Sequence, residues 1–375
     1  MSTTVSVVPC KAYELERVRE AVAGCLEPLG GMKRFVKLGM HVLLKPNMFT
    51  GARPDQAVTT HPLMVQVVAE LVEAAGGEAI IGDSSSGQTK DNPAIWKKTR
   101  MVSAAEASGT PLVLFDGVSW REVDGVNYFI ARPALEADLV INLPKLKTHD
   151  LTLYSGAVKN IFGVIPGMRK RDIHLRAPGV PDFSRELVNL LAIIRPGLTI
   201  MDGVVGLEGQ GPGPSGTPHA FGVLAASSDP VALDAVMSHA MGFKTGEVTH
   251  LLQASERGLG VADLRLIHVA GGHAALNFGP LAMPHAHWFA RHIPGWLGPP
   301  MEEMTRLQPR VDAMACTGCG KCAQVCPGSQ VIEVGRPIRF NPEHCIGCMC
   351  CAEVCPQAAI HATRGRAARL LGLSV

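Results

Sequence analysis

At 375 residues the chain is long enough for one large domain with a smaller appendage, and with 47% hydrophobic residues it can form a sizeable core. The net charge is only +2 and aromatic residues make up 5%, which disfavours nucleic acid as a partner. Any cationic function must therefore be local, and this favours a small anionic ligand over a charged polymer.

The amino-terminal residues and the most apolar window bear on cellular location. Residues 1–20 lack the basic region and the long apolar run of a secretory signal. The most apolar window, residues 187–206, is interrupted by Arg195, Pro196 and Asp202, which argues against a membrane span. We therefore expect a cytoplasmic protein without a transmembrane segment.

Apolar runs of strand length recur along the chain, and each ends in polar residues. They occupy residues 41–47, 78–87, 112–117, 138–149 and 198–213. Helix-like segments lie between several of them, such as residues 61–77, with an apolar stripe and a glycine stop, and residues 228–242, with Asp229 as an N-cap before Pro230. Strands that alternate with helices predict an α/β fold with a largely parallel sheet and helices on both of its faces.

Polar residues gather where these strands end, which is where open α/β sheets bind their ligands. The run LPKLKTH places Lys145, Lys147 and His149 two residues apart, so they can share one face of an extended segment. We predict that this edge binds an anionic group of a substrate, although each residue taken alone is equally well explained as a solvated or turn-capping side chain. The predicted substrate-binding residues are Lys45, Asn47, Asp83, Ser84, Lys145, Lys147, Asn160, His174 and Asp202, and the predicted catalytic residues are His149, Lys159 and Lys147.

Residues 168–176, MRKRDIHLR, are strongly basic. Two interpretations stay open for them: solvated surface charge, or a mobile basic loop over the anion pocket. The glycine-rich residues 206–216 lack the pattern of a dinucleotide-binding loop, and their prolines favour an irregular lid.

Nine of the eleven cysteines lie between Cys316 and Cys355. They form two runs with the spacing C-x2-C-x2-C-x3-C-P, typical of bacterial two-cluster ferredoxins, in which the fourth cysteine of each run binds the other cluster. Zinc is the alternative, but eight ligands in two equal runs exceed what zinc needs. We therefore predict two [4Fe–4S] clusters, the first bound by Cys316, Cys319, Cys322 and Cys355 and the second by Cys345, Cys348, Cys351 and Cys326.

Cys350 is a ninth cysteine within these runs. The favoured interpretation is a bystander next to a ligand, while an exchange with Cys351 or a redox role stays open. Cys10 and Cys25 are expected to be small core residues. No flavin motif stands out, but many flavin sites have none, so a flavin stays open as a further cofactor.

Composition divides the chain into four segments. We expect residues 1–277 to form the anion-binding α/β domain and residues 308–363 a small α+β ferredoxin-like domain with two clusters. Residues 278–307, rich in Pro, His and Trp, would connect them, and residues 364–375 form a basic tail. An alternative role for the connecting segment is contact with a membrane surface through Trp288, Phe289 and Trp296.

The chain resembles the domain of unknown function 362 family at several motifs taken together: LLKPNM, TTHP, GDSSSG, INLPKLKTH, GAVKNIFG, MDGVVGLEGQGP and DPVALD. In many members of that family such a domain is followed by a two-cluster ferredoxin domain. The resemblance implies an iron–sulfur redox protein, and it supplies no substrate.

These observations predict an iron–sulfur oxidoreductase of the ferredoxin-dependent reductase type. An external low-potential donor, such as a ferredoxin, a flavodoxin or a reductase, would supply electrons through the clusters to a small carboxylate- or phosphate-bearing substrate in the α/β domain. The alternative is a non-enzymatic electron carrier or assembly factor that docks on a partner protein. A redox-neutral enzyme with clusters as sensor or structural element is less favoured.

Overall fold

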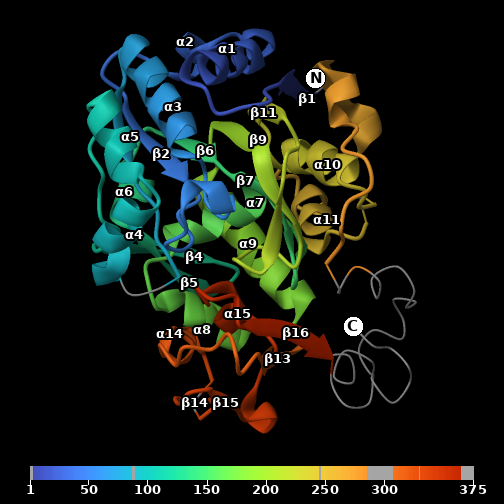
Figure 1. The fold of residues 1–375 in the computed structure, drawn as a ribbon. Helices are drawn as coiled ribbons and strands as arrows, with labels where there is room; N and C mark the ends of the chain where they lie inside the picture. The colour runs from blue at the N-terminus through green and yellow to red at the C-terminus, as the bar shows by residue number, and fades with distance from the viewer. Residues whose placement is uncertain are drawn as a thin grey trace.

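The computed structural model describes residues 3–86, 89–244, 246–284, 287, 307–328 and 330–364. Its main element is a ten-stranded sheet (Figure 1). The order along the sheet is β12 (Ile267–Gly271), β1 (Thr3–Pro9), β11 (Val223–Ser227), β9 (Leu198–Gly209), β6 (Leu139–Leu143), β2 (His41–Pro46) and β3 (Glu78–Ile81). β10 (Gly216–His219) pairs with β9, and β7 (Lys145–His149) pairs with both β9 and β8 (Leu153–Ser155).

The sheet is mostly parallel, and it has a hydrophobic core on each face. β2 runs parallel to both β3 and β6, and β6 and β7 run parallel to β9. Side chains alternate between the two cores along each central strand: Leu43 and Val140 enter one core, whereas Leu44 and Ile141 enter the other. Strands buried on both faces explain the near-continuous apolar runs in the sequence.

Helices cover both faces of the sheet (Figure 1). One core packs against α6 (Arg132–Glu136), α7 (Ala157–Asn160), α8 (Arg169–Arg176), α9 (Val180–Ile194), α10 (Pro230–Ala240) and α11 (Thr249–Glu256). The other packs against α1 (Leu15–Leu26), α2 (Met32–Phe35), α3 (Pro62–Ala74), α4 (Asn92–Lys98) and α5 (Met101–Ser108). A separate hairpin consists of β4 (Val118–Val123) and β5 (Val126–Ala131). The predicted α/β fold is confirmed.

The start of α10 forms as the sequence predicts. The Asp229 side chain accepts hydrogen bonds from the backbone N–H groups of Val231 and Ala232, both at 2.9 Å, and Pro230 occupies the first turn. Proline costs nothing there, because its missing N–H would have no helical partner in any case.

Two strand predictions differ from the structure. Residues 112–117 form only an isolated bridge between Leu112 and Ile81, so Asp116 does not follow a strand of the sheet. β9 continues to Gly209, because it pairs first with β11 and then with β10 and β7. Asp202 therefore lies within a strand and not at its end.

The cysteine-rich residues form a small module with its own core. Two short antiparallel sheets, β13 (Leu307–Val311) with β16 (Ile360–Arg364) and β14 (Ile332–Glu333) with β15 (Arg339–Phe340), accompany α14 (Lys321–Val325) and α15 (Cys350–Glu353). Figure 1 shows this module beside α8, at the end of the large domain remote from α1 and α2.

Part of the predicted connection between the domains lies outside the described residues. This applies to Trp288, Phe289 and Trp296, and to the tail beyond Arg364. Within the described ranges, no helix combines the length and the apolarity needed to cross a membrane.

Candidate functional site

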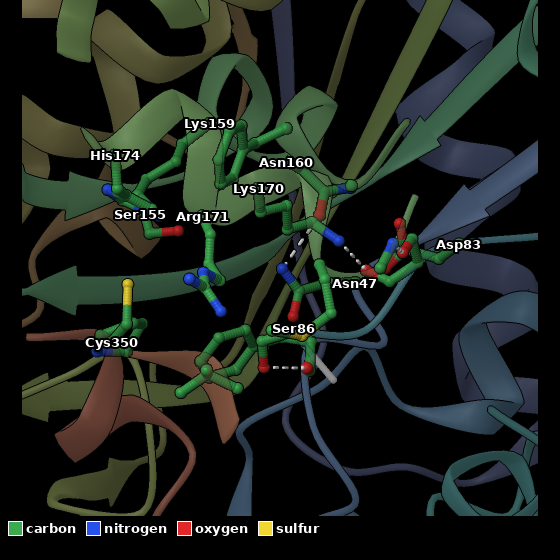
Figure 2. Close-up of a pocket in the computed structure, with 18 of the residues that line it drawn as sticks. Asn47, Asp83, Ser86, Ser155, Lys159, Asn160, Lys170, Arg171, His174 and Cys350 are labelled. Atoms are coloured by element: carbon green, nitrogen blue, oxygen red, sulfur yellow. Dashed lines mark hydrogen bonds between the residues drawn. The ribbon is translucent and has the colours of Figure 1, made fainter. Parts of the chain in front are cut away.

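A pocket with a cavity volume of about 70 Å³ lies between the large domain and the cysteine-rich module (Figure 2). Its walls come from the loops after β2 and β3, from β7, from α7 and α8, and from the module. The polar and sulfur-bearing side chains that line it are Asn47, Asp83, Ser84, Ser86, Lys147, Ser155, Lys159, Asn160, Met168, Lys170, Arg171, His174 and Cys350.

A chain of amides connects the strand ends beneath the pocket. Lys147 Nζ donates to Asn47 Oδ1 at 3.2 Å and to the carbonyl of Val58 at 2.8 Å. Asn47 Nδ2 donates to Asn160 Oδ1 at 2.9 Å, and Asn160 Nδ2 donates to Asn142 Oδ1 at 2.8 Å. These bonds fix the side chains of three strands and α7 relative to one another, which preorganises the pocket floor.

Asp83 contributes a carboxylate whose charge is already matched. Lys45 Nζ donates to Asp83 Oδ1 at 2.8 Å, and the backbone N–H of Met48 donates to Oδ2 at 2.7 Å. Both side chains are buried, and burial lowers the pKa of Lys45 against the opposing effect of Asp83. Gly163 covers this pair so closely that a Cβ atom there would lie 2.0 Å from Asp83 Oδ1. Lys45 therefore neutralises the pocket's carboxylate and does not itself line the pocket.

Positive charge dominates the rest of the wall. α8 contributes Lys170, Arg171 and His174, and His174 lies one helical turn after the other two, four and three residues along the chain. Lys170 Nζ donates to the carbonyl oxygens of Ser84 at 2.7 Å and Ser85 at 2.9 Å. Arg171 Nε is buried and has no hydrogen-bond partner among the described residues. A buried donor without a partner is costly, so an acceptor on a ligand would stabilise this arrangement.

Lys170 titrates close to neutrality. Its pKa is lowered to about 7, mainly by burial; the charge of Asp83 opposes this shift, and the charges of Lys45 and Lys159 add to it. An ammonium group with such a pKa can give up a proton near physiological pH.

The position of α7 depends on a buried carboxylate of α10. Asp234 accepts hydrogen bonds from the backbone N–H groups of Ala157 at 2.7 Å and Val158 at 2.8 Å, and from the Tyr154 hydroxyl at 3.0 Å. Burial raises the pKa of Asp234 to about 7, although these bonds oppose the shift. Asp234 thereby holds the first turn of the helix that carries Lys159 and Asn160.

Lys145 and Asp202 form a second buried pair, which does not line the pocket. Lys145 Nζ donates to Asp202 Oδ2 at 2.9 Å and to the Tyr13 hydroxyl at 2.7 Å. The backbone N–H of His61 also donates to Asp202 Oδ2, at 2.8 Å, and the Tyr13 and His61 rings stack at 3.6 Å. This pair joins the amino-terminal segment to β7 and β9.

His149 has a local structural contact and does not line the pocket. Its Nδ1 accepts hydrogen bonds from the backbone N–H groups of Leu151 at 3.0 Å and Thr152 at 3.3 Å, which holds the turn between β7 and β8. The alternation of side chains predicted that Lys145, Lys147 and His149 can share one face of an extended segment. In the structure their hydrogen-bond partners differ: Lys145 bonds to Asp202 and Tyr13, Lys147 to Asn47 and Val58, and His149 to the turn that follows it.

Seven predicted residues meet at the pocket: Asn47, Asp83, Ser84, Lys147, Lys159, Asn160 and His174. Lys45, Lys145, His149 and Asp202 do not line it. The sequence prediction left out Ser86, Ser155, Lys170, Arg171 and Cys350. Two of these, Lys170 and Arg171, belong to the basic residues 168–176 that the sequence analysis singled out. They lie on a helix, α8, and not on the mobile loop that was considered there.

The cysteines gather around two further cavities. Cys316, Cys319, Cys322 and Cys355 line one of them, and Cys326, Cys345, Cys348 and Cys351 line the other. Gly318 and Gly347 have φ values of 70° and 72°, which brings the ligand loops close to each cavity. Four thiols around each space fit the ligand set of an iron–sulfur cluster.

The pocket and the cysteine-rich module are in contact. Val325 and Cys350 of the module line the pocket, and Arg171 Nη2 donates to the carbonyl of Pro327 at 3.4 Å. In the view of Figure 2, Cys350 and Asp83 lie at opposite sides of the pocket.

Comparison with known protein families gives one match for the large domain and one for the cysteine-rich module. Residues 42–239 match the model of the domain of unknown function DUF362, and residues 308–356 match a 4Fe-4S dicluster domain. The thylakoid-associated protein sll1697 of Synechocystis is 39% identical over 241 residues, which are 64% of this chain and 74% of that protein.

Among solved structures, the lactate racemase apoprotein from Thermoanaerobacterium thermosaccharolyticum matches with a TM-score of 0.39 and 13% identity, over 61% of this chain and 54% of that one. The chain thus spans about half the length of that protein. The two family matches confirm the resemblance inferred from the motifs: the chain belongs to the DUF362 family and carries a carboxyl-terminal iron–sulfur domain of the 4Fe-4S dicluster type.

Proposed function

We propose that this protein is an iron–sulfur oxidoreductase that reduces a small anionic substrate in the pocket. The observation that supports this most directly is a cationic pocket with walls from both the α/β domain and the cysteine-rich module. A binding site for an anion and a supply of electrons would then meet at one place.

Two [4Fe–4S] clusters would supply one-electron transfer to this site. Cys316, Cys319, Cys322 and Cys355 would hold the first, and Cys345, Cys348, Cys351 and Cys326 the second. An external low-potential donor, such as a ferredoxin, a flavodoxin or a reductase, would supply the electrons.

The pocket residues would bind the substrate and supply protons. Lys147 and Arg171 would bind its carboxylate or phosphate group, since cations in a partly buried site stabilise both the bound anion and the charge that develops on reduction. Reduction of a carbon–carbon or carbonyl double bond takes two electrons and two protons. Lys159 and Lys170 would donate the protons, in place of His149, which does not line the pocket.

The proposed location is the cytoplasm, where reduced cysteines and a soluble donor are available. The relative from Synechocystis is named as thylakoid-associated, so attachment to a membrane surface is the other outcome to test. Fractionation of cells at low and high salt separates the two, because a peripheral protein sediments with membranes and is released by salt.

The first experiment uses anaerobically purified protein. Iron and sulfide are measured, and everything released on denaturation is identified by mass spectrometry, with about eight irons expected for two four-iron clusters. A released flavin or anionic metabolite would identify the chemistry of the pocket.

The decisive step follows on the reduced protein. Anionic fractions of a metabolite extract are tested for faster reoxidation of the clusters than buffer gives, and the product is identified. Lys159→Ala should abolish the acceleration while the cluster spectrum is unchanged, and Lys97→Ala, at an exposed lysine elsewhere, should retain it. If no fraction accelerates reoxidation, the reductase proposal fails and a carrier or docking role takes its place.

A further inference from the structure

Among the described residues, the cysteine-rich module contributes Val325 and Cys350 to the pocket wall, and both are direct neighbours of cysteines of one ligand set. Val325 directly precedes Cys326, and Cys350 lies between Cys348 and Cys351. All three of these cysteines line the second cavity. Among the residues that the structure describes, none that lines the first cavity also lines the pocket.

Arg171 connects the pocket to the same cavity. Its guanidinium lines the pocket and donates to the carbonyl of Pro327, and Pro327 lines the second cavity. A positive charge next to a cluster favours the reduced state, which carries one more negative charge.

The internal repeat provides a comparison within the module. The two cysteine runs align residue by residue, so that Cys319 corresponds to Cys348 and Lys321 to Cys350. In the first run Cys319 and Lys321 are exposed. In the second run Cys348 is buried and Cys350 lines the pocket. One backbone motif thus faces solvent in one copy and the large domain in the other.

We propose that the two cluster sites work in a fixed order: the site of Cys326, Cys345, Cys348 and Cys351 exchanges electrons with the pocket, and the site around exposed Cys319 receives them from the external donor. The charge of Arg171 raises the reduction potential of the pocket-facing cluster. This inference rests on the proposed function. An anion bound beside Arg171 offsets its charge, so occupancy of the pocket lowers that potential and makes the cluster a stronger reductant.

The test measures the reduction potential of each cluster in the full-length, cluster-loaded protein. Redox titration is followed by electron paramagnetic resonance, and the two signals are assigned with Cys319→Ser, which alters the first site alone. If that variant does not fold, Cys326→Ser is used instead, because it alters the second site and so identifies the signal of that cluster. Arg171→Gln removes the charge, and Arg171→Lys retains it as the matched control.

In Arg171→Gln we expect the reduction equilibrium of the second cluster to become about tenfold less favourable, a shift of about 59 mV for a one-electron couple. The first cluster should keep its potential, and Arg171→Lys should keep both. A shift of the first cluster, an equal shift of both, or no shift in a folded variant would overturn the assigned order.

Sulfate binding, measured separately by calorimetry, distinguishes this inference from the proposed function. If sulfate does not bind but Arg171→Gln shifts only the second cluster, the placement of that cluster holds and the anion-reductase proposal loses its support. If sulfate binds but the first cluster responds, the proposed function stands and the order is wrong.

Discussion

Four lysines around the strand ends and α8 have two different roles, and the hydrogen-bond partner of each lysine decides which role it has. Lys45 and Lys145 are fully buried, and each donates to a carboxylate, at 2.8 Å and 2.9 Å. Lys147 and Lys170 donate to amide or backbone oxygens and line the pocket. A carboxylate partner neutralises the lysine and makes it part of the fold, whereas hydrogen bonds to neutral oxygens hold the ammonium group in place at the pocket wall.

The largest effect is expected from breaking a neutralised pair. Lys145→Ala leaves Asp202 buried without its cation, which should lower the free energy of unfolding by about 3–5 kcal/mol. Urea denaturation measures the change. The double variant Lys145→Ala with Asp202→Ala should lose less than the single one, since no uncompensated charge remains. A loss below about 1 kcal/mol in the single variant would contradict a structural role for this pair.

A smaller effect on stability, but a clear one on binding, is expected at the pocket. Lys159 lies partly exposed on α7, so Lys159→Ala should change the free energy of unfolding by only about 0.5 kcal/mol. Loss of a charged hydrogen bond to the ligand costs about 1.5–3 kcal/mol, so sulfate affinity should fall roughly ten- to hundredfold. Calorimetry measures the affinity, and Lys159→Arg should restore most of it. Unchanged affinity would place the anion elsewhere.

The smallest expected effect is a pH dependence. Lys170, with its pKa lowered to about 7 mainly by burial, is charged below that pH and neutral above it. Sulfate, whose own charge is constant through the neutral range, should therefore bind more weakly as pH rises through about 7, by at most tenfold per unit for one proton.

Asp234 has a pKa raised to about 7 and titrates in the same range, so the wild type alone does not isolate Lys170. Lys170→Arg keeps its charge throughout, and the difference between the two profiles gives the contribution of Lys170. Identical profiles would show that Lys170 does not titrate with the ligand.

The sequence predicted the fold and the edge of the sheet that carries the pocket, because both predictions rest on patterns within short stretches of sequence: the periodicity of apolar residues and the polar residues that follow each strand. It could not separate Lys145 from Lys147, since their difference comes from Asp202, which approaches only because β9 continues beyond the expected strand end. The sequence could not predict that Cys350 lines the pocket, for a different reason. Its place in the pocket depends on how two domains pack, and no spacing within the cysteine runs records that contact.

The pocket between the two domains also limits which ferredoxin modules could replace this one. Because Val325 and Cys350 complete a site whose other walls belong to the large domain, neither domain contains the whole site. Exchange of the cysteine-rich module for another ferredoxin would preserve the ligands yet replace these two wall residues. Substitutions at Val325 and Cys350 would therefore alter the wall of the pocket as well as the cysteine-rich module.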